Sequence, residues 1–209
     1  MTDTRPVSNP LALAVLALLF ERPMHPYEMA TTLREREKAE SIKLRFGSLY
    51  SVIDRLQAEG LIQAGERVRE GKRPERTVYH ITDAGTAEMR DWLRELISTP
   101  VKEYPQFEAG LSLLPVLPPD EAIEMLEVRL ELLDGMIDEI EAKHEQATEH
   151  GVPELFIIES RYKAHQFAAE REWIRGLIDR MVDEQWADVD LMEGIPSWRE
   201  LHEMRRDER

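Results

Sequence analysis

The most informative segment of the chain is residues 46–82, which read FGSLYSVIDRLQAEGLIQAGERVREGKRPERTVYHIT. Its first part predicts a helix over residues 46–59, and Gly60 suits the left-handed residue that commonly ends a helix. The apolar residues of this helix recur at helical spacing: Leu49, Val52, Ile53 and Leu56. Two strands are expected next, over residues 61–69 and 76–81, joined by a basic and turn-rich connection. The segment therefore predicts an amphipathic helix followed by a basic β-hairpin.

Further helices flank this segment on both sides. The apolar residues 11–20 predict a short buried helix, capped by Asn9 and with Pro10 in its first turn. A second helix is expected over residues 26–38. After the second strand, Thr82 or Asp83 should cap a helix that reaches Ser98, whose apolar residues are Trp92, Leu93, Leu96 and Ile97. Three helices, a strand, a basic turn and a strand are the order of a winged helix-turn-helix domain.

The second half of the chain predicts a helical hairpin. Five prolines lie within residues 100–119, and they leave room for one short helix over about 107–114. Asp120 should cap a helix to about residue 149, which carries a heptad seam: Ile123, Leu126, Leu130, Leu133, Ile137, Ile140, His144 and Ala147. The sequence Gly151-Val152-Pro153 should end it. A last long helix over residues 154–186 should present the stripe Leu155, Ile158, Tyr162, His165, Ala169 and Trp173, followed by Leu177/Ile178 and Met181. Residues 187–209 are expected to be a frayed, charged tail.

The predicted fold class is therefore mainly α. A winged helix-turn-helix domain over residues 1–99 is followed by a coiled-coil-like helical domain over residues 100–209.

Charge divides the chain at the same place. The 27 basic and 42 acidic residues give a net charge of −15, which taken alone argues against binding to DNA. Residues 1–99, however, contain 15 basic and 15 acidic residues, so the whole acidic excess lies in the second half. Residues 43–76 carry eight basic residues against five acidic ones. Such asymmetry indicates that the two halves have different partners.

Several classes of site are disfavoured by composition. The chain has no cysteine, so thiolate metal sites and disulfides are excluded. Its six histidines show neither the helical i,i+4 pairing nor the HExxH pattern of zinc sites, and no glycine-rich phosphate loop is present. An apolar run of ten residues is too short to span a membrane. We therefore expect a cytoplasmic protein that is not an enzyme and has no metal, cofactor or membrane partner.

The predicted winged helix suggests how DNA could be bound. Helix 46–59 should enter the major groove with its polar face, while the basic hairpin tip reaches the phosphates. Lys43 and Arg45, just before this helix, are added on charge grounds.

Four motifs in this order resemble one family. They are His25-Pro26-Tyr27-Glu28, Gly47-Ser48-Leu49-Tyr50, Arg55-Leu56-x-x-Glu59-Gly60-Leu61-Ile62 and Tyr79-x-Ile81-Thr82-x-x-Gly85. Together they are similar to the PadR family of bacterial transcriptional regulators, densely over residues 9–98 and more loosely over 100–185. Pro26 stands where the family usually has Gly, and Ser51 where it usually has Pro. Since both departures lie beside the expected DNA face, the operator sequence is not carried over.

The resemblance implies a ligand-responsive homodimeric repressor, or less often an activator, of which the repressor is our prediction. With the two residues added above, the predicted DNA-binding set is Tyr27, Lys43, Arg45, Ser48, Tyr50, Ser51, Arg55, Lys72, Arg73 and Arg76. For Tyr27 and Tyr50, half-buried packing between helices is an equal alternative. The alternative for the whole protein is a winged-helix module that binds proteins without sequence-specific DNA recognition.

The second half should provide the dimer contact and an effector site. Dimerisation is predicted through the heptad seam residues Ile123, Leu126, Leu130, Leu133, Ile137 and Ile140. A small aromatic or amphipathic effector is predicted where Trp92, Phe107, Tyr162 and Gln166 could converge. The alternative for Trp92 is an anchor that packs the first domain onto the second.

Overall fold

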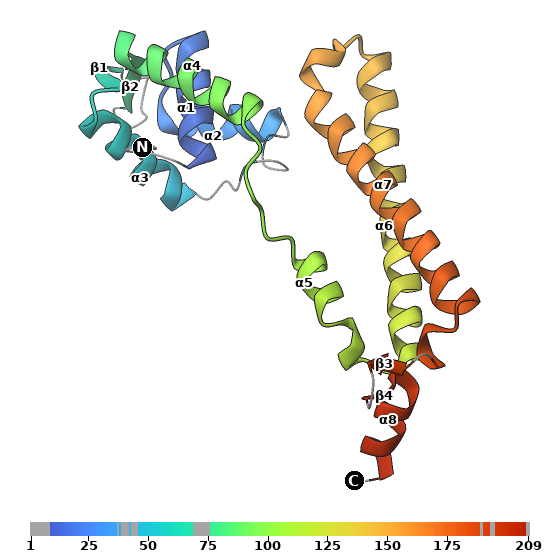
Figure 1. The fold of residues 1–209 in the computed structure, drawn as a ribbon. Helices are drawn as coiled ribbons and strands as arrows, with labels where there is room; N and C mark the ends of the chain where they lie inside the picture. Colours follow the sequence, from blue (N-terminus) through green and yellow to red (C-terminus); the bar gives the residue numbers. More distant parts are fainter. Residues whose placement is uncertain are drawn as a thin grey trace. The chain divides into compact units, whose positions relative to one another are not determined.

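The computed structural model describes residues 9–36, 38, 42, 46–68, 76–188, 190–192 and 195–207. Two compact units make up the chain, Met1–Lys102 (unit 1) and Glu103–Arg209 (unit 2). Unit 1 contains four helices and a β-hairpin, and unit 2 is built on two long helices (Figure 1). The predicted fold class, a winged helix-turn-helix followed by a helical region, is confirmed. No described helix is both long enough and apolar enough to cross a membrane.

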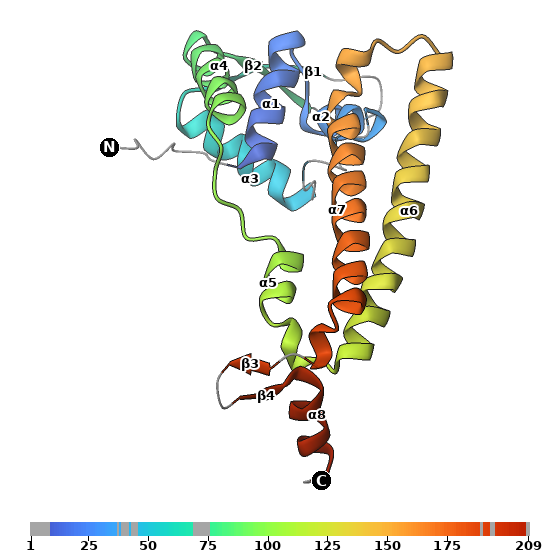
Figure 2. The ribbon, with the colours of Figure 1, turned by 45° about the vertical axis from the view of Figure 1, so that its right-hand side comes forward.

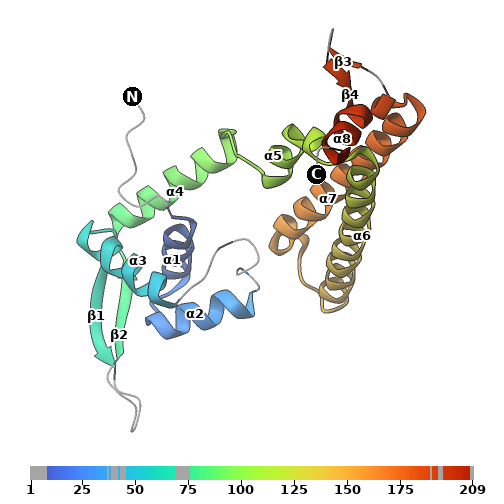
Figure 3. The same ribbon diagram turned by 90° about the horizontal axis from the view of Figure 1, so that it is seen from below.

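Unit 1 follows the predicted order of elements. Its helices are α1 (Pro10–Glu21), α2 (Pro26–Glu35), α3 (Phe46–Ala58) and α4 (Asp83–Ser98). Strand β1 (Ile62–Val68) pairs antiparallel with β2 (Arg76–Ile81), and the two strands run side by side at the edge of the unit (Figure 3). On the other side of β2, the backbone groups of Met24 and Tyr79 bond to each other, which ties the α1–α2 connection to the hairpin.

Local capping residues determine the helix ends, as predicted. The Asn9 side chain accepts from the backbone N–H of Leu11 at 2.9 Å, which caps α1. Thr82, rather than Asp83, caps α4 by accepting from the backbone N–H of Gly85 at 3.0 Å. Gly60 has a φ of +70°, in the left-handed region. The second helix is shorter than predicted, because it ends at Glu35.

The junction of α4 with the α3–β1 corner is unusually close. The Thr82 hydroxyl contacts the backbone oxygens of Gly60 and Leu61 at 2.8 and 3.0 Å. A Cβ atom on Gly85 would lie only 2.0 Å from the Leu61 carbonyl oxygen. Glycine is therefore required at position 85, which gives a physical reason for the Thr82-x-x-Gly85 motif.

Helix α1 forms the centre of the unit 1 core. Seven of its twelve residues are buried, and it packs against α3, α4 and β2. Helix α4 contributes Met89 and Trp92 to this core. The other apolar residues of this helix, Leu93, Leu96 and Ile97, are exposed within the chain.

Unit 2 is organised around a helical hairpin, as predicted. Helix α6 (Pro119–Glu149) and helix α7 (Ile158–Asp183) lie side by side, with α5 (Gln106–Ser112) beside the end of the hairpin where α6 begins (Figure 2). Short 3₁₀ turns, η1 (Leu114–Val116), η2 (Glu154–Phe156) and η3 (Trp186–Asp188), connect the helices. Asp120 does not cap α6, since Pro118 holds the capping position and the helix begins one residue before Asp120.

The two hairpin helices meet through the predicted face of α6 and through a face of α7 of which only the second half was predicted. The α6 seam packs inside the hairpin, with Leu126, Leu133 and Ile137 buried. The first part of the predicted α7 stripe is wrong, because its large side chains Leu155, Ile158, Tyr162 and Trp173 are all exposed. The second part is confirmed, since Leu177, Ile178 and Met181 pack in the unit 2 core, where Phe167 and Ile174 join them. Polar pairs join the same two helices, including Asp134 with Arg171 at 2.7 Å and His144 with Ser160 at 2.7 Å.

The expected frayed tail is largely structured, so that prediction is also wrong. Strands β3 (Asp190–Met192) and β4 (Ile195–Ser197) form a small hairpin that leads into α8 (Trp198–Asp207). Ser197 and Glu200 cap α8 reciprocally, each side chain accepting from the other residue's backbone N–H. The Trp198 side chain is buried in the unit 2 core, and its indole N–H donates to the Leu117 carbonyl oxygen at 2.7 Å. This bond joins the start of α8 to the segment that precedes α6.

Candidate nucleic-acid interface

Helix α3 presents one buried face and one exposed polar face. Leu49, Val52, Ile53 and Leu56 are buried in the unit 1 core, as their spacing predicted. The opposite face exposes Tyr50, Ser51, Asp54 and Arg55, while Ser48 is half-buried. The Ser51 hydroxyl donates to the carbonyl oxygen of Gly47 at 3.1 Å. The face available for a DNA groove thus carries three hydrogen-bonding side chains and one acid.

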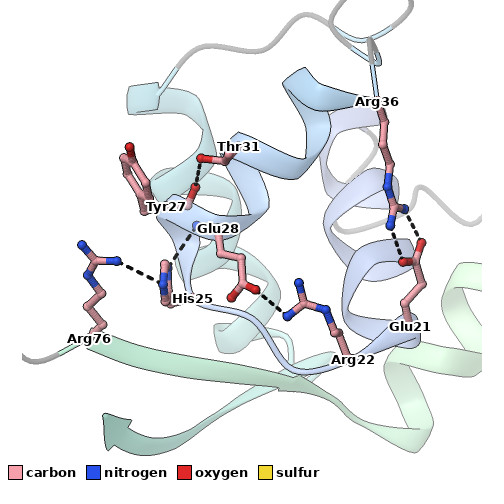
Figure 4. Close-up of polar contacts among 8 residues, drawn as sticks. All are labelled: Glu21, Arg22, His25, Tyr27, Glu28, Thr31, Arg36 and Arg76. Carbon is pink, nitrogen blue, oxygen red and sulfur yellow. Dashed lines mark hydrogen bonds and ion pairs between the residues drawn. The ribbon is translucent and has the colours of Figure 1, made fainter. Parts of the chain in front are cut away.

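The start of α2 positions a histidine and a tyrosine beside each other. His25 is the capping residue, and its Nδ1 accepts from the backbone N–H of Glu28 at 3.0 Å. Tyr27 follows in the first turn with 57% of its surface exposed. The two ring centroids lie 6.4 Å apart. Glu28 itself forms an ion pair with Arg22, so its charge is compensated locally (Figure 4).

Arg76 brings the β-hairpin to this same place. It opens β2, and its Nη1 lies 3.2 Å from His25 Nε2 (Figure 4). Its guanidinium carbon also lies 5.4 Å from the centroid of the Tyr27 ring. His25, Tyr27 and Arg76 thus form a cluster from two elements, which we call the α2–β2 cluster. The sequence prediction omitted His25, although its place before Pro26 at a helix start was a visible capping signal.

Tyr79 is a half-buried residue of β2, and its backbone helps to hold the α2–β2 cluster in place. Burial raises the pKa of Tyr79 above its ordinary value, and the charges of Asp54 and Tyr50 add to this. Its backbone bonds to Met24 fix the connection that leads into His25. This residue belongs to the predicted motif, and its role here is structural.

The structure describes six of the ten predicted DNA-binding residues. Tyr27 and Arg76 are brought together, whereas Tyr50, Ser51 and Arg55 lie on the exposed face of α3 and Ser48 at its margin. Tyr50 is 52% exposed, so neither it nor Tyr27 is the half-buried packing residue of the alternative interpretation. Lys43, Arg45, Lys72 and Arg73 lie outside the described residues, and they remain predictions.

The predicted effector residues come from both units, so their convergence on one site stays a prediction. Trp92 is 5% exposed within the core of unit 1, whereas the other three belong to unit 2. Gln166 donates to the Tyr162 hydroxyl at 2.9 Å on the exposed side of α7. Phe107 borders a groove of about 260 Å³, whose other lining residues are Pro105, Glu108, Leu111, Glu170 and Trp173.

The groove combines two aromatic rings with charged groups at its edge. Phe107 and Trp173 meet edge to face with centroids 6.4 Å apart. Arg129 places its guanidinium 3.9 Å from the Phe107 centroid and donates to Glu170 at 2.6 Å. The sequence pattern assigned Trp173 to a helical stripe and did not predict its contact with Phe107 on α5.

The predicted dimerisation residues are covered by their own chain. Leu126, Leu133 and Ile137 are buried against α7, and Ile123, Leu130 and Ile140 are half-buried. Burial within one chain does not test a contact with a second copy, so dimerisation through these residues stays a prediction. The apolar residues that α6 leaves exposed are Met125, Val128, Leu132 and Met136.

Comparison with known proteins gives a consistent picture. Residues 15–91 match the model of the "Transcriptional regulator PadR-like family". The "Negative transcriptional regulator PadR" of Bacillus subtilis (strain 168) is 22% identical over 146 residues, which cover 70% of this chain and 79% of that protein.

Solved structures share the fold. The crystal structure of Bacillus subtilis PadR in complex with operator DNA has a TM-score of 0.67 at 19% identity and covers 83% of this chain and 99% of that one. The same protein in complex with p-coumaric acid has a TM-score of 0.62 at 16% identity, with coverage of 85% and 99%. A PadR-like transcriptional regulator from Bacillus cereus has a TM-score of 0.56 at 18% identity, with coverage of 83% and 99%.

Proposed function

We propose that the chain is a member of the PadR-like family of transcriptional regulators, whose model residues 15–91 match, and that it is a ligand-responsive, homodimeric repressor that binds a pseudo-palindromic operator. Helix α3 would enter the major groove, and the hairpin that carries Lys72 and Arg73 would contact the flanking phosphates. A two-fold dimer would place one α3 in each of two half-sites, about 34–36 Å apart.

One observation carries the DNA-binding part of this proposal. The exposed Tyr27 and the half-buried Arg76 come from separate elements and lie together in the domain whose α3 exposes Tyr50 and Arg55. Arginine and tyrosine side chains are common contacts to phosphate and sugar, and α3 adds polar groups that can reach base edges. The operator complex of Bacillus subtilis PadR supports this use of the fold.

The dimer is supported by apolar surface that the hairpin leaves uncovered. Along α6, Met125, Val128, Leu132 and Met136 recur at helical spacing and are between 44% and 60% exposed. Continuous apolar surface of this kind commonly marks a protein contact. A second copy of the chain packed along α6 would remove it from water.

The effector is proposed to bind at the groove beside Phe107. Its edge-to-face pair, Phe107 and Trp173, offers the apolar contact that a small aromatic or amphipathic molecule requires. The p-coumaric acid complex of Bacillus subtilis PadR supports an aromatic effector for this fold. Titration of p-coumaric acid while tryptophan fluorescence is followed tests the groove, and Phe107→Ala should abolish any change that reflects binding there.

Sequencing of the DNA that co-purifies with the protein from its own cells tests the main proposal. We expect a small set of fragments that share a two-fold symmetric sequence, and protection of that sequence from nuclease by the purified chain. Recovery of random fragments, with no protected sequence, would contradict operator binding. Recovery of a stable partner protein and no DNA would favour the alternative, a winged-helix module for protein contacts, which the match to the family model does not favour.

A further inference from the structure

The α2–β2 cluster places two side-chain donors against each other. His25 lies before α2 and Arg76 opens β2, so the fold brings together residues that are far apart in the sequence (Figure 4). His25 Nε2 and Arg76 Nη1 are 3.2 Å apart. Whether this contact is a hydrogen bond depends on which ring nitrogen of His25 carries the proton.

The capping bond determines the position of that proton. The backbone N–H of Glu28 donates to His25 Nδ1 at 3.0 Å, and a ring nitrogen that accepts a hydrogen bond carries no proton. The proton of the imidazole must then lie on Nε2. The helix fixes the direction of the Glu28 N–H, whereas the Arg76 side chain can rotate, so the capping bond is the one that the backbone imposes.

The contact between His25 and Arg76 therefore joins two donors. Arginine has donors only and stays charged at every pH relevant to proteins, so Arg76 cannot accept from Nε2–H. Neither group satisfies the other, and both would gain from an oxygen that accepts from each of them.

The surroundings favour an anion at this position. Glu28, the acid nearest to His25 in sequence, is paired with Arg22. Among the described residues, no acid forms an ion pair with Arg76. The Tyr27 ring lies within cation–π distance of the guanidinium and restricts its position. The cluster thus offers one neutral donor, one positively charged donor and a ring that holds them in place.

We propose that His25 Nε2–H and Arg76 together bind one phosphate group of the DNA backbone. This inference rests on the proposed DNA binding, and it adds His25 as a ligand and phosphate, rather than a base, as its target. Because every sequence presents phosphates, the site should contribute to operator and random DNA alike, and it should fix the register of α2 on the duplex.

The two ligands differ in charge, so their removal should leave different signatures. His25→Asn keeps an oxygen that can cap α2 but lacks a donor at the Nε2 position. Loss of the Nε2–H donor should weaken binding to a random duplex about tenfold per site, which is the usual cost of losing a hydrogen bond to a charged group. The dependence of log K on log salt should stay unchanged, because a neutral donor releases no counterion.

Arg76→Gln should behave differently. Loss of one cation at a phosphate should reduce the slope of log K against log salt by about 0.9 per site, with the largest effect at low salt. Arg94→Gln is the matched control, since Arg94 is exposed on α4 and pairs with Asp91 outside the cluster. Its affinity and its salt slope should equal those of the unmodified chain.

The experiment measures fluorescence anisotropy of a labelled random duplex over a salt series for the three variants and the unmodified chain. Far-ultraviolet circular dichroism establishes that each variant is folded. An unchanged affinity for a folded His25→Asn variant would overturn the proposal. A lowered salt slope for the same variant would overturn the neutral-donor role.

A second measurement does not depend on DNA binding. The ¹⁵N chemical shifts of the His25 ring report which nitrogen carries the proton, and we expect Nε2–H at neutral pH. A proton on Nδ1 would overturn the inference even if the protein binds DNA.

Inorganic phosphate alone, at millimolar concentration, is the probe for an isolated anion. If the unmodified chain binds no duplex but phosphate shifts the Nε2 resonance, the anion site stands and the proposed function fails. If neither duplex nor phosphate binds, both fail. If the duplex binds but phosphate alone causes no shift, the site is used only within the DNA contact, and the variant affinities decide the proposal.

Discussion

Replacement of Gly85 by alanine should selectively destabilise unit 1. The new Cβ atom would lie 2.0 Å from the Leu61 carbonyl oxygen, whereas real Cβ contacts are almost never shorter than 3.0 Å, so the backbones must separate by about 1 Å. That oxygen accepts from the Thr82 backbone N–H at 3.1 Å and from the Thr82 hydroxyl at 3.0 Å. The separation would therefore disturb the two bonds that hold α4 against the α3–β1 corner.

The magnitude follows from three contributions. Overpacking costs about 1–3 kcal/mol, and two weakened hydrogen bonds cost about 1 kcal/mol each. The better helix propensity of alanine offsets about 1 kcal/mol of this cost. The net loss of unfolding free energy should therefore be about 2–4 kcal/mol.

Hydrogen exchange followed by mass spectrometry measures this loss separately for each unit. Peptides from α3 should exchange faster in Gly85→Ala, whereas peptides from α6 should be unchanged. Gly110→Ala is the matched control, because Gly110 lies in α5 with no atom within 4 Å of the added Cβ and should, if anything, gain stability. Unchanged exchange in α3 of Gly85→Ala would refute the reasoning about this close approach.

Three further predictions concern the basic tip of the β-hairpin, the pH dependence of stability and the helical hairpin of α6 and α7. Lys72→Ala with Arg73→Ala should weaken binding to operator and random duplexes alike, and the salt slope of a dimer should fall by roughly 4, as measured by anisotropy at several salt concentrations; loss of operator binding alone would show that these residues read bases. Burial raises the folded-state pKa of Tyr79 above the unfolded value of about 10. The stability that the protonated phenol contributes is complete below the unfolded pKa and is lost as the pH rises through the folded pKa. Denaturant unfolding of Tyr79→Phe should therefore lack this loss. Leu126→Ala should destabilise unit 2 by about 2–5 kcal/mol, because Leu126 is buried. Leu132→Ala should leave the folded chain intact and weaken self-association in sedimentation, because Leu132 is exposed. The opposite pattern would contradict the assignment of the inner and outer faces of α6.

Features that depend on local chemistry were predictable from the sequence. Asn9, Gly60 and Thr82 act on backbone groups within a few residues, so the positions of α1, α3 and α4 follow from short patterns. The buried face of α3 was predictable for the same reason, since its apolar stripe is narrow and the rest of the helix is polar.

Features that depend on the partner of a helix were not predictable in the same way. Helix α7 carries apolar residues on more than one face, so periodicity alone could not decide whether Trp173 or Ile174 faces α6. The contact of His25 with Arg76 and the bond of Trp198 to Leu117 join residues far apart in the sequence, and no local rule relates them. The capping pair Ser197 and Glu200, by contrast, was a readable signal that α8 exists.

The central position of α1 also has a consequence for protein synthesis. This helix precedes in the chain every element that covers it, and its last partner, α4, ends only at Ser98. As the chain leaves the ribosome, the apolar surface of residues 11–20 therefore stays without its native cover until α4 has emerged. Through that interval the nascent chain exposes a segment that chaperones would bind, and unit 1 becomes compact only when all of its helices are present.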